Sequence, residues 1–201
     1  MGYHDTAACW RPDRFGGERY EGELFCGVNY RMSELTGAVM LAQLGKLDRL
    51  LAAMQVNKNR IKHQIEGLNG ITFRRLNDRL GDTAICLMFM LDDKGKVGPF
   101  VDALKAEGVD AVGVFDKGIP DWHIYSHWKH VLDKATPTPE GCPYACPHYK
   151  GDAPSRYSAD MCPNTNEVLS RTVHLDIPSQ LTAEDCDMIA HGIGKVAQAL
   201  L

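Results

Sequence analysis

The sequence lacks a long hydrophobic run, a surplus of basic residues and an apolar leader, and each absence excludes a class of protein. No stretch approaches the roughly 18 to 20 consecutive apolar residues that a membrane-spanning helix needs. Lys plus Arg number 22 against 26 Asp plus Glu, for a net charge of -4, so bulk charge gives no reason to expect binding to nucleic acid or an anionic bilayer. The start of the chain has no apolar core like that of a secretion signal. We therefore expect a cytoplasmic chain with no nucleic-acid or membrane partner.

The 201 residues, 44% of them hydrophobic, suffice for one ordinary globular domain with a docked subdomain. Seven cysteines are an odd number in a chain without an export signal, so we expect reduced thiols rather than a disulfide framework.

Three stretches of the chain differ in pattern. Residues 1–32 are rich in Gly, Arg, Asp and aromatic residues without a sustained period, which predicts a loop segment that belongs to a larger fold. Over residues 33–67 apolar residues recur every three or four positions, which predicts one long linking helix with Ser33 as its N-cap and Gly67 or Gly70 at its end. Residues 68–201 mix strands and helices and predict a small α+β domain.

Strands are predicted over residues 71–75, 84–91, 109–115 and 171–177, the second so apolar that both its faces should be covered. A short helix is predicted after Pro99 and should end at Gly108 in the left-handed conformation. A final helix is predicted over residues 181–201, where Thr182 and Asp185 have the spacing of a capping box.

Asn29 and Arg31 lie just before the start of the predicted linking helix. An amide donor, a guanidinium and the positive end of a helix dipole then converge on one point, an arrangement suited to a phosphate group. The alternative is that both side chains only fix the start of the helix.

The run G-x-N-x-R-M-S-E followed by A-Q-L-x-K-L-D closely resembles the DegT/DnrJ/StrS family of sugar aminotransferases, in the segment after their cofactor lysine. The resemblance continues through Lys58, Asn59 and Arg60, through H-I-Y-x-H-W at 123–128, and through R-T-V-H-L-D-I-P-S-Q-L-T-x-E-D at 171–185. It therefore covers nearly the whole chain.

The resemblance implies a pyridoxal 5'-phosphate (PLP) enzyme of the aspartate-aminotransferase type (fold type I) that works as a homodimer. Such enzymes move an amino group from glutamate or glutamine to a keto sugar. Asn29 would then contact the phosphate of the neighbouring subunit's PLP, and Arg31 would orient the anionic part of the substrate. His4 matches a family histidine, but Asp5 stands where the family has glycine, so no catalytic role is assigned to it. His123 would contact the sugar.

The family's Schiff-base lysine, in an S-F-x-x-x-K stretch followed by G-E-G-G, has no match in this chain. Lys46, Lys58 and Lys62 are expected on the polar face of a helix, where a solvated amine is a poor nucleophile at neutral pH. The resemblance thus implies the C-terminal portion of an aminotransferase, in which residues 1–32 remain from the large PLP domain. This chain should contain no catalytic residue and should be inactive in isolation.

Two side-chain clusters could carry other chemistry. Cys142, Cys146, His148 and Cys162 could form a tetrahedral zinc site, but their C-x3-C-x-H spacing is a weak match and an ordered loop is the preferred interpretation. His123, His127 and His130 would share one face if their segment were helical, as metal ligands or proton carriers might, but a solvated or packed histidine is the preferred interpretation for each of them.

We therefore expect the C-terminal part of a PLP-dependent sugar aminotransferase that acts in cell-envelope polysaccharide or lipopolysaccharide biosynthesis. The W-H-I-Y and C-P-rich stretches resemble the branch that acts on an octulosonate sugar. The alternatives are a catalytically silent subunit that docks on a full-length aminotransferase, and a small zinc-stabilised domain.

Overall fold

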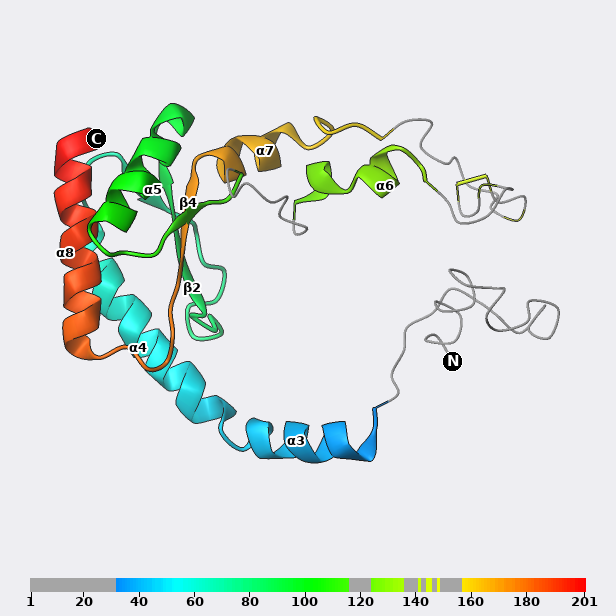
Figure 1. Cartoon of the computed structure of the whole chain (residues 1–201), viewed down its shortest axis with the longest axis horizontal. Coiled ribbons are helices and arrows are strands. Elements are labelled where there is room, and N and C mark those ends of the chain that lie inside the picture. The colour runs from blue at the N-terminus through cyan, green and yellow to red at the C-terminus, as the bar shows by residue number, and fades with distance from the viewer. Residues whose placement is uncertain (1–31, 116–123, 136–140, 142–143, 146–147, 149–156) are drawn as a thin grey trace. The chain divides into compact units, whose positions relative to one another are not determined.

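A computed structural model describes residues 32–115, 124–135, 141, 144–145, 148 and 157–201 (Figure 1). The chain divides into two compact units, Met1–Leu44 with Trp128–Ala159, and Gly45–His127 with Asp160–Leu201. We call the second the sheet unit, because it contains every strand of the described residues.

The sheet has four antiparallel strands in the order β1-β2-β4-β3. Their bounds are β1 (Ile71–Phe73), β2 (Cys86–Leu91), β3 (Val112–Gly113) and β4 (Thr172–Asp176). The register pairs Leu87 with Leu175 and Phe89 with Val173, so large apolar residues of the two central strands share one face. All four predicted strands are confirmed, but β3 is much shorter than predicted.

Three helices of the sheet unit lie on one side of the sheet (Figure 1): α4 (Leu47–Ile65), α5 (Val97–Ala106) and α8 (Ala183–Leu200). Their apolar faces form one core with the strands, in which the Phe89 ring meets those of Phe73 and Phe100 edge to face at 6.3 and 6.0 Å. A layer of helices on one face of an antiparallel sheet confirms the α+β class.

The two faces of β2 differ in burial. Leu87, Phe89 and Leu91 are buried in the core, whereas Cys86, Met88 and Met90 on the opposite face are only half-buried. The expectation that this strand is fully covered on both faces is therefore wrong for the described structure. An apolar run alone did not reveal that its alternate residues differ in environment.

The predicted linking helix is divided into α3 (Glu34–Leu44) and α4, with Gly45 and Lys46 between them. Glycine inside a helix is about 1 kcal/mol less favourable than alanine, which is a physical reason for a break at Gly45. The predicted N-cap is confirmed, since the Thr36 amide donates to Ser33 Oγ at 3.1 Å. α4 ends at Ile65 and is followed by Gly67 with φ +94°, as predicted.

Helices α5 and α8 have the predicted caps. Gly108 has φ +81°, and the amides of Gly108 and Val109 donate to the carbonyls of Lys105 and Leu104, at 3.0 and 2.9 Å, in a Schellman motif. Thr182 and Asp185 exchange side-chain to backbone hydrogen bonds in a capping box.

The other helical segments are short: η2 (Lys94–Lys96), η3 (Tyr125–His127), α6 (Lys129–Leu132) and α7 (Pro163–Ser170). Helix α7 was not predicted from the sequence, although it begins with Pro163 in its first turn, a position that proline favours. No helix in the described part of the chain has both the length and the hydropathy required to cross a membrane.

Candidate functional site

The three residues predicted to contact cofactor or substrate lie outside the described residues. They are Asn29, Arg31 and His123, and their roles stay predictions. The described residues that follow each of them show how the chain continues on the C-terminal side.

The helix start that follows Arg31 is α3. Ser33 accepts the Thr36 amide, and Ser33 Oγ lies 2.8 Å from Thr36 Oγ1, so this cap satisfies one donor of the first turn. The amides of Glu34 and Leu35 still have no partner within the helix, and Glu34 places a carboxylate beside the same positive end of the dipole. The N-terminus of α3 can therefore donate hydrogen bonds from these two amides, but the Glu34 carboxylate already complements the helix dipole.

The segment that follows His123 is anchored within the sheet unit. Ile124 is buried, with 2% of its surface exposed. The Tyr125 hydroxyl accepts hydrogen bonds from the Cys162 amide at 2.9 Å and from Asn166 Nδ2 at 3.2 Å. These contacts fix the chain next to His123 against the start of α7.

The predicted face of three histidines does not form as a single helix. Residues 125–127 belong to η3 and residues 129–132 to α6, with Trp128 between them. His127 is half-buried and its ring packs edge-on against Phe115 at 5.7 Å. The break between the helices removes the regular spacing on which a shared histidine face depends.

A buried ion pair joins α4 to the loop between β1 and β2. Lys58 Nζ donates to Asp82 Oδ2 at 2.6 Å, and the two side chains are only 7% and 13% exposed. The Ala84 amide donates to Asp82 Oδ1 at 3.2 Å, and Arg74 Nη2 lies 3.9 Å from the same oxygen. Burial alone would raise the pKa of Asp82, but the hydrogen bonds from Lys58 and Ala84 and the nearby positive charges hold this pKa below its ordinary value.

The expectation that Lys58 lies on a solvated helix face is therefore wrong. Its partner comes from a loop 24 residues further along the chain, which a helical pattern does not reveal. Lys46 is exposed, and Lys62 lies over the Phe73 ring at 5.1 Å. That none of these three lysines is a Schiff-base lysine stays a prediction.

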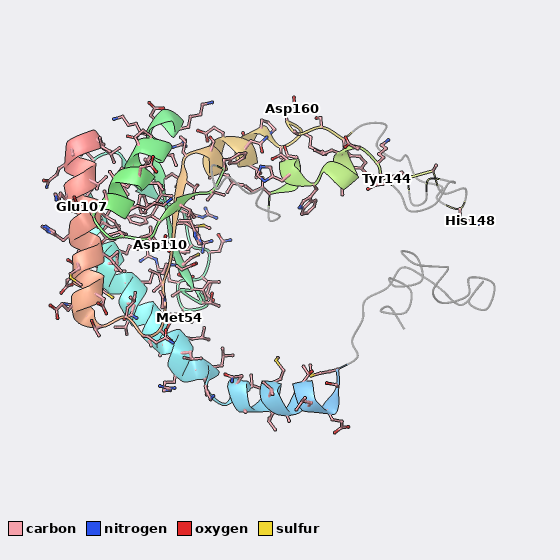
Figure 2. The ribbon with its side chains drawn as sticks, in the orientation of Figure 1. Met54, Glu107, Asp110, Tyr144, His148 and Asp160 are labelled. Atoms are coloured by element: carbon pink, nitrogen blue, oxygen red, sulfur yellow. The ribbon has the colours of Figure 1, made fainter. Side chains whose placement is uncertain are left out.

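A groove of about 290 Å³ opens beside β4, between residues 108–112 and 174–178. Asp110, labelled in Figure 2, contributes to its lining, and His174 Nε2 lies 3.7 Å from Asp176 Oδ1. The β3–β4 register ends at the pair Val112 and His174. If it continued, Asp110 would oppose Asp176, and like charges directly opposite each other disfavour pairing. β3 pairs with β4 only at Val112 and Gly113.

The predicted zinc ligands are only partly described. Cys142 and Cys146 lie outside the described residues, whereas His148 and Cys162 are exposed. Within the part of the chain that the structure describes, no three His, Cys, Asp or Glu side chains come together in a way that could hold a metal ion.

A sequence profile of the DegT/DnrJ/EryC1/StrS aminotransferases matches residues 8–146, more than two thirds of the chain. The chain belongs to this family. The DegT/DnrJ/EryC1/StrS enzymes are PLP-dependent sugar aminotransferases, and the matched range contains Asn29, Arg31 and His123.

Solved structures share the fold with this family member. The sugar aminotransferase CalS13 from Micromonospora echinospora is 18% identical, with a TM-score of 0.52, and the match covers 85% of this chain and 37% of that one. 3-Amino-5-hydroxybenzoic acid synthase is 18% identical, with a TM-score of 0.56, and the match covers 87% and 41%. DesI, solved in the presence of its TDP-sugar product, is 20% identical, with a TM-score of 0.53 and coverage of 85% and 37%. The chain thus spans about two fifths of the length of these structures.

Proposed function

We propose that this chain is the C-terminal part of a PLP-dependent sugar aminotransferase, which transfers an amino group from glutamate or glutamine to a keto sugar. The family match over residues 8–146 carries this proposal, because it includes the N-x-R motif at Asn29 and Arg31. The likeness to DesI, a protein solved with a TDP-sugar, supports a nucleotide-linked keto sugar as the substrate class.

In this proposal the chain supplies binding groups and another polypeptide segment supplies the lysine. PLP, when bound, would withdraw electrons from the reacting carbon of the amino donor. Asn29 would donate a hydrogen bond to the cofactor phosphate of a neighbouring subunit, and Arg31 would pair with an anionic group of the substrate. His123 would contact the sugar from the segment that Tyr125 anchors to α7.

We further propose that the pathway is cell-envelope polysaccharide or lipopolysaccharide biosynthesis, with an octulosonate sugar as the acceptor. The W-H-I-Y segment and the C-P-rich tract carry this narrower assignment. The enzyme would work in the cytoplasm as a homodimer or with a full-length aminotransferase subunit.

A catalytically silent subunit is the second candidate function, and α3 favours it. None of its residues is buried in the structure, and five of its large apolar side chains are more than half exposed: Leu35, Val39, Met40, Leu41 and Leu44. A helix that is apolar on all sides is normally buried against other protein. A silent subunit would use this surface for docking without contributing to the reaction.

The decisive experiment is to sequence the DNA upstream of the Met1 codon and to express the chain joined to any lysine domain encoded there. We expect the joined protein to bind PLP and to transaminate a keto-sugar nucleotide with glutamate or glutamine. In it, Asn29→Ala should weaken PLP binding about tenfold to a hundredfold, through loss of one charge-assisted hydrogen bond worth roughly 1.5 to 3 kcal/mol. Unchanged PLP affinity would reject the role of Asn29, and a joined protein without transaminase activity would favour the silent subunit.

A further inference from the structure

The groove beside β4 opens where the pairing of β3 with β4 ends. Its volume of about 290 Å³ is close to the lower end of the range for small-ligand pockets, about 300 Å³. One lip is the segment 108–112, which carries the Asp110 labelled in Figure 2, and the other lip is the segment 174–178 at the end of β4. The groove therefore separates two stretches of backbone that pair with each other only at one end.

The main chain of Asp176 faces this groove. Along a strand of an antiparallel sheet, the peptide groups of successive residues point alternately to one neighbouring strand and to the other. The Thr172 carbonyl accepts a hydrogen bond from the Val114 amide at 3.1 Å, on the β3 side. Asp176 lies an even number of residues after Thr172 in the same strand, so its amide and carbonyl also point to the β3 side, away from β2.

These peptide groups have no strand to pair with. The β3–β4 register ends at the pair Val112 and His174, two residues before Asp110 and Asp176 would meet. Among the hydrogen bonds of the described residues, none uses the main-chain amide or carbonyl of either aspartate. Both lips thus present an unused donor and an unused acceptor, which is the arrangement that pairs with an added extended segment.

The floor of the groove is apolar, and one lip is held firmly. A Cβ added to Gly192 of α8 would lie only 3.0 Å from Val109 Cγ2, so α8 packs closely against the lip that carries Asp110. An apolar floor favours an occupant with apolar side chains. The floor consists of Val109, Ala111, Leu175 and Ile177, which are buried, and of Leu181 and Ile189, which are partly buried.

The rim of the groove carries negative charge. Asp110 and Asp176 both line the groove, and its lining contains no Lys or Arg. In the part of the chain that the structure describes, neither carboxylate forms an ion pair with a Lys or Arg, and Asp176 has only His174 Nε2 nearby, at 3.7 Å. A rim with charge of one sign favours an occupant of the opposite sign.

We propose that this groove binds an extended peptide segment that carries a lysine or an arginine, as an added strand beside the end of β4. Hydrogen bonds to the free peptide groups of Asp176 and Asp110 would align the segment. Its alternate apolar side chains would reach the floor, and its basic side chain would lie between the two carboxylates. A small organic cation would leave the peptide groups unpaired, so the free backbone favours a peptide. The groove would bind such a segment whether or not the chain is part of an aminotransferase.

The test is a calorimetric titration of the full chain with a short peptide of alternating threonine and valine that has one central lysine and is blocked at both ends. We expect binding, with protection of the Asp110 and Asp176 amides from hydrogen exchange measured by NMR. Glutamate in place of the lysine should weaken binding about tenfold, because it reverses the sign of the ion pair. Methylation of alternate backbone nitrogens of the peptide, which prevents strand pairing, should abolish binding.

Variants of the chain test the two lips. Asp110→Asn and Asp176→Asn should each weaken binding of the lysine peptide about twofold to fivefold, the range for an exposed ion pair. Asp102→Asn on α5 and Asp48→Asn on α4 remove the same charge from exposed positions outside the groove, and they should bind the peptide like the unaltered chain. Circular dichroism melts establish that all four variants are folded.

Two results would overturn the proposal. One is that the lysine peptide does not bind, or that it binds equally well to folded Asp110→Asn and Asp176→Asn. The other is that the methylated peptide, or n-butylammonium alone, binds as tightly as the lysine peptide, which would show that the groove recognises a cation without pairing to its backbone.

Discussion

Asp82 organises the loop between β1 and β2 through three acceptor atoms. Its two carboxylate oxygens accept from Lys58 Nζ and from the Ala84 amide, and its carbonyl oxygen accepts from Gln55 Nε2 at 2.8 Å. Ala84 is buried and has φ +56°, a left-handed conformation that is unusual for a residue with a Cβ. The hydrogen bond from its amide to Asp82 helps to hold this conformation.

Lys58→Ala should lower the free energy of unfolding by about 2 to 4 kcal/mol, because it leaves the Asp82 carboxylate nearly buried without its closest partner. Chemical denaturation monitored by circular dichroism measures the change. Lys105→Ala, which removes an exposed lysine of α5, should change stability by less than about 0.5 kcal/mol. Equal effects of the two substitutions would show that the buried pair contributes no more to the free energy of unfolding than an exposed lysine does.

The same pair predicts a pH dependence. Burial raises the pKa of Asp82, but the hydrogen bonds from Lys58 and Ala84 together with the positive charges of Lys58 and Arg74 hold the folded-state pKa below its ordinary value. Its contribution to stability is thus fully present above the unfolded-state pKa, near about 4, and is lost as the pH falls through the folded-state pKa. The stability difference between the unaltered chain and Lys58→Ala should therefore shrink on acidification below about pH 4. A constant difference would contradict this linkage.

At the scale of single elements, glycine conformation decides where α5 ends. Gly108 follows α5 at φ +81°, and a Cβ added to it would meet no atom within 4 Å. Gly194 lies inside α8, and its surroundings are equally open. Neither position has a steric obstacle to a methyl group, so the backbone conformation alone should set the effect of alanine.

Gly108→Ala should destabilise the chain by about 1 kcal/mol, because alanine is strained in the left-handed region. Gly194→Ala should stabilise it by about 0.5 to 1 kcal/mol, because alanine is the better helix former. Thermal melts of the two variants test this pair. A shift of the melting temperature in the same direction in both would show that backbone conformation does not control these sites.

The elements that could be predicted from the sequence are those whose determinants are local. Thr182 and Asp185 are three residues apart, and the capping box needs only that spacing. The burial of Lys58, by contrast, depends on Asp82, and the length of β3 depends on how many of its residues pair with β4. Both effects involve residues distant in sequence, which periodicity within one element does not report.

For the candidate site, too, local motifs could be predicted from the sequence and contacts between distant residues could not. The motif at Asn29 and Arg31 pointed to the family because it is local and specific, and the profile match confirms that membership. The buried pair of Lys58 and Asp82 was missed because its two residues are 24 positions apart and meet only in the folded sheet unit.

At the scale of the whole molecule, the chain spans about two fifths of the length of its structural relatives. Of the lysines expected on the helix from 33 to 67, Lys46 is exposed, Lys58 is paired with Asp82, and Lys62 lies over Phe73. Under the proposed function, the lysine that binds PLP would come from none of these three positions.

The isolated chain, incubated with PLP and then with borohydride, should yield no lysine adduct at a stoichiometric level and no transaminase activity, because proton transfer at the substrate carbon lacks its base. Mass spectrometry of the intact chain and of its peptides measures the adduct. A lysine of this chain labelled at one equivalent, together with turnover, would show that the chain is a complete catalyst.

The exposed apolar side chains of α3 predict that the chain, expressed alone, self-associates. Several hundred Å² of apolar surface at about 25 cal/mol per Å² is enough to drive association. Leu35 and Leu41 are 78% and 73% exposed, so Leu35→Gln combined with Leu41→Gln should reduce the mass measured by light scattering without altering the core of the sheet unit.

Met161→Gln combined with Met188→Gln is the matched control. It replaces side chains outside α3 that are 51% and 59% exposed, and it should leave association unchanged. If the unaltered chain is instead a compact monomer with a sharp cooperative melt, α3 needs no partner, and the chain is an independent domain rather than part of a larger enzyme.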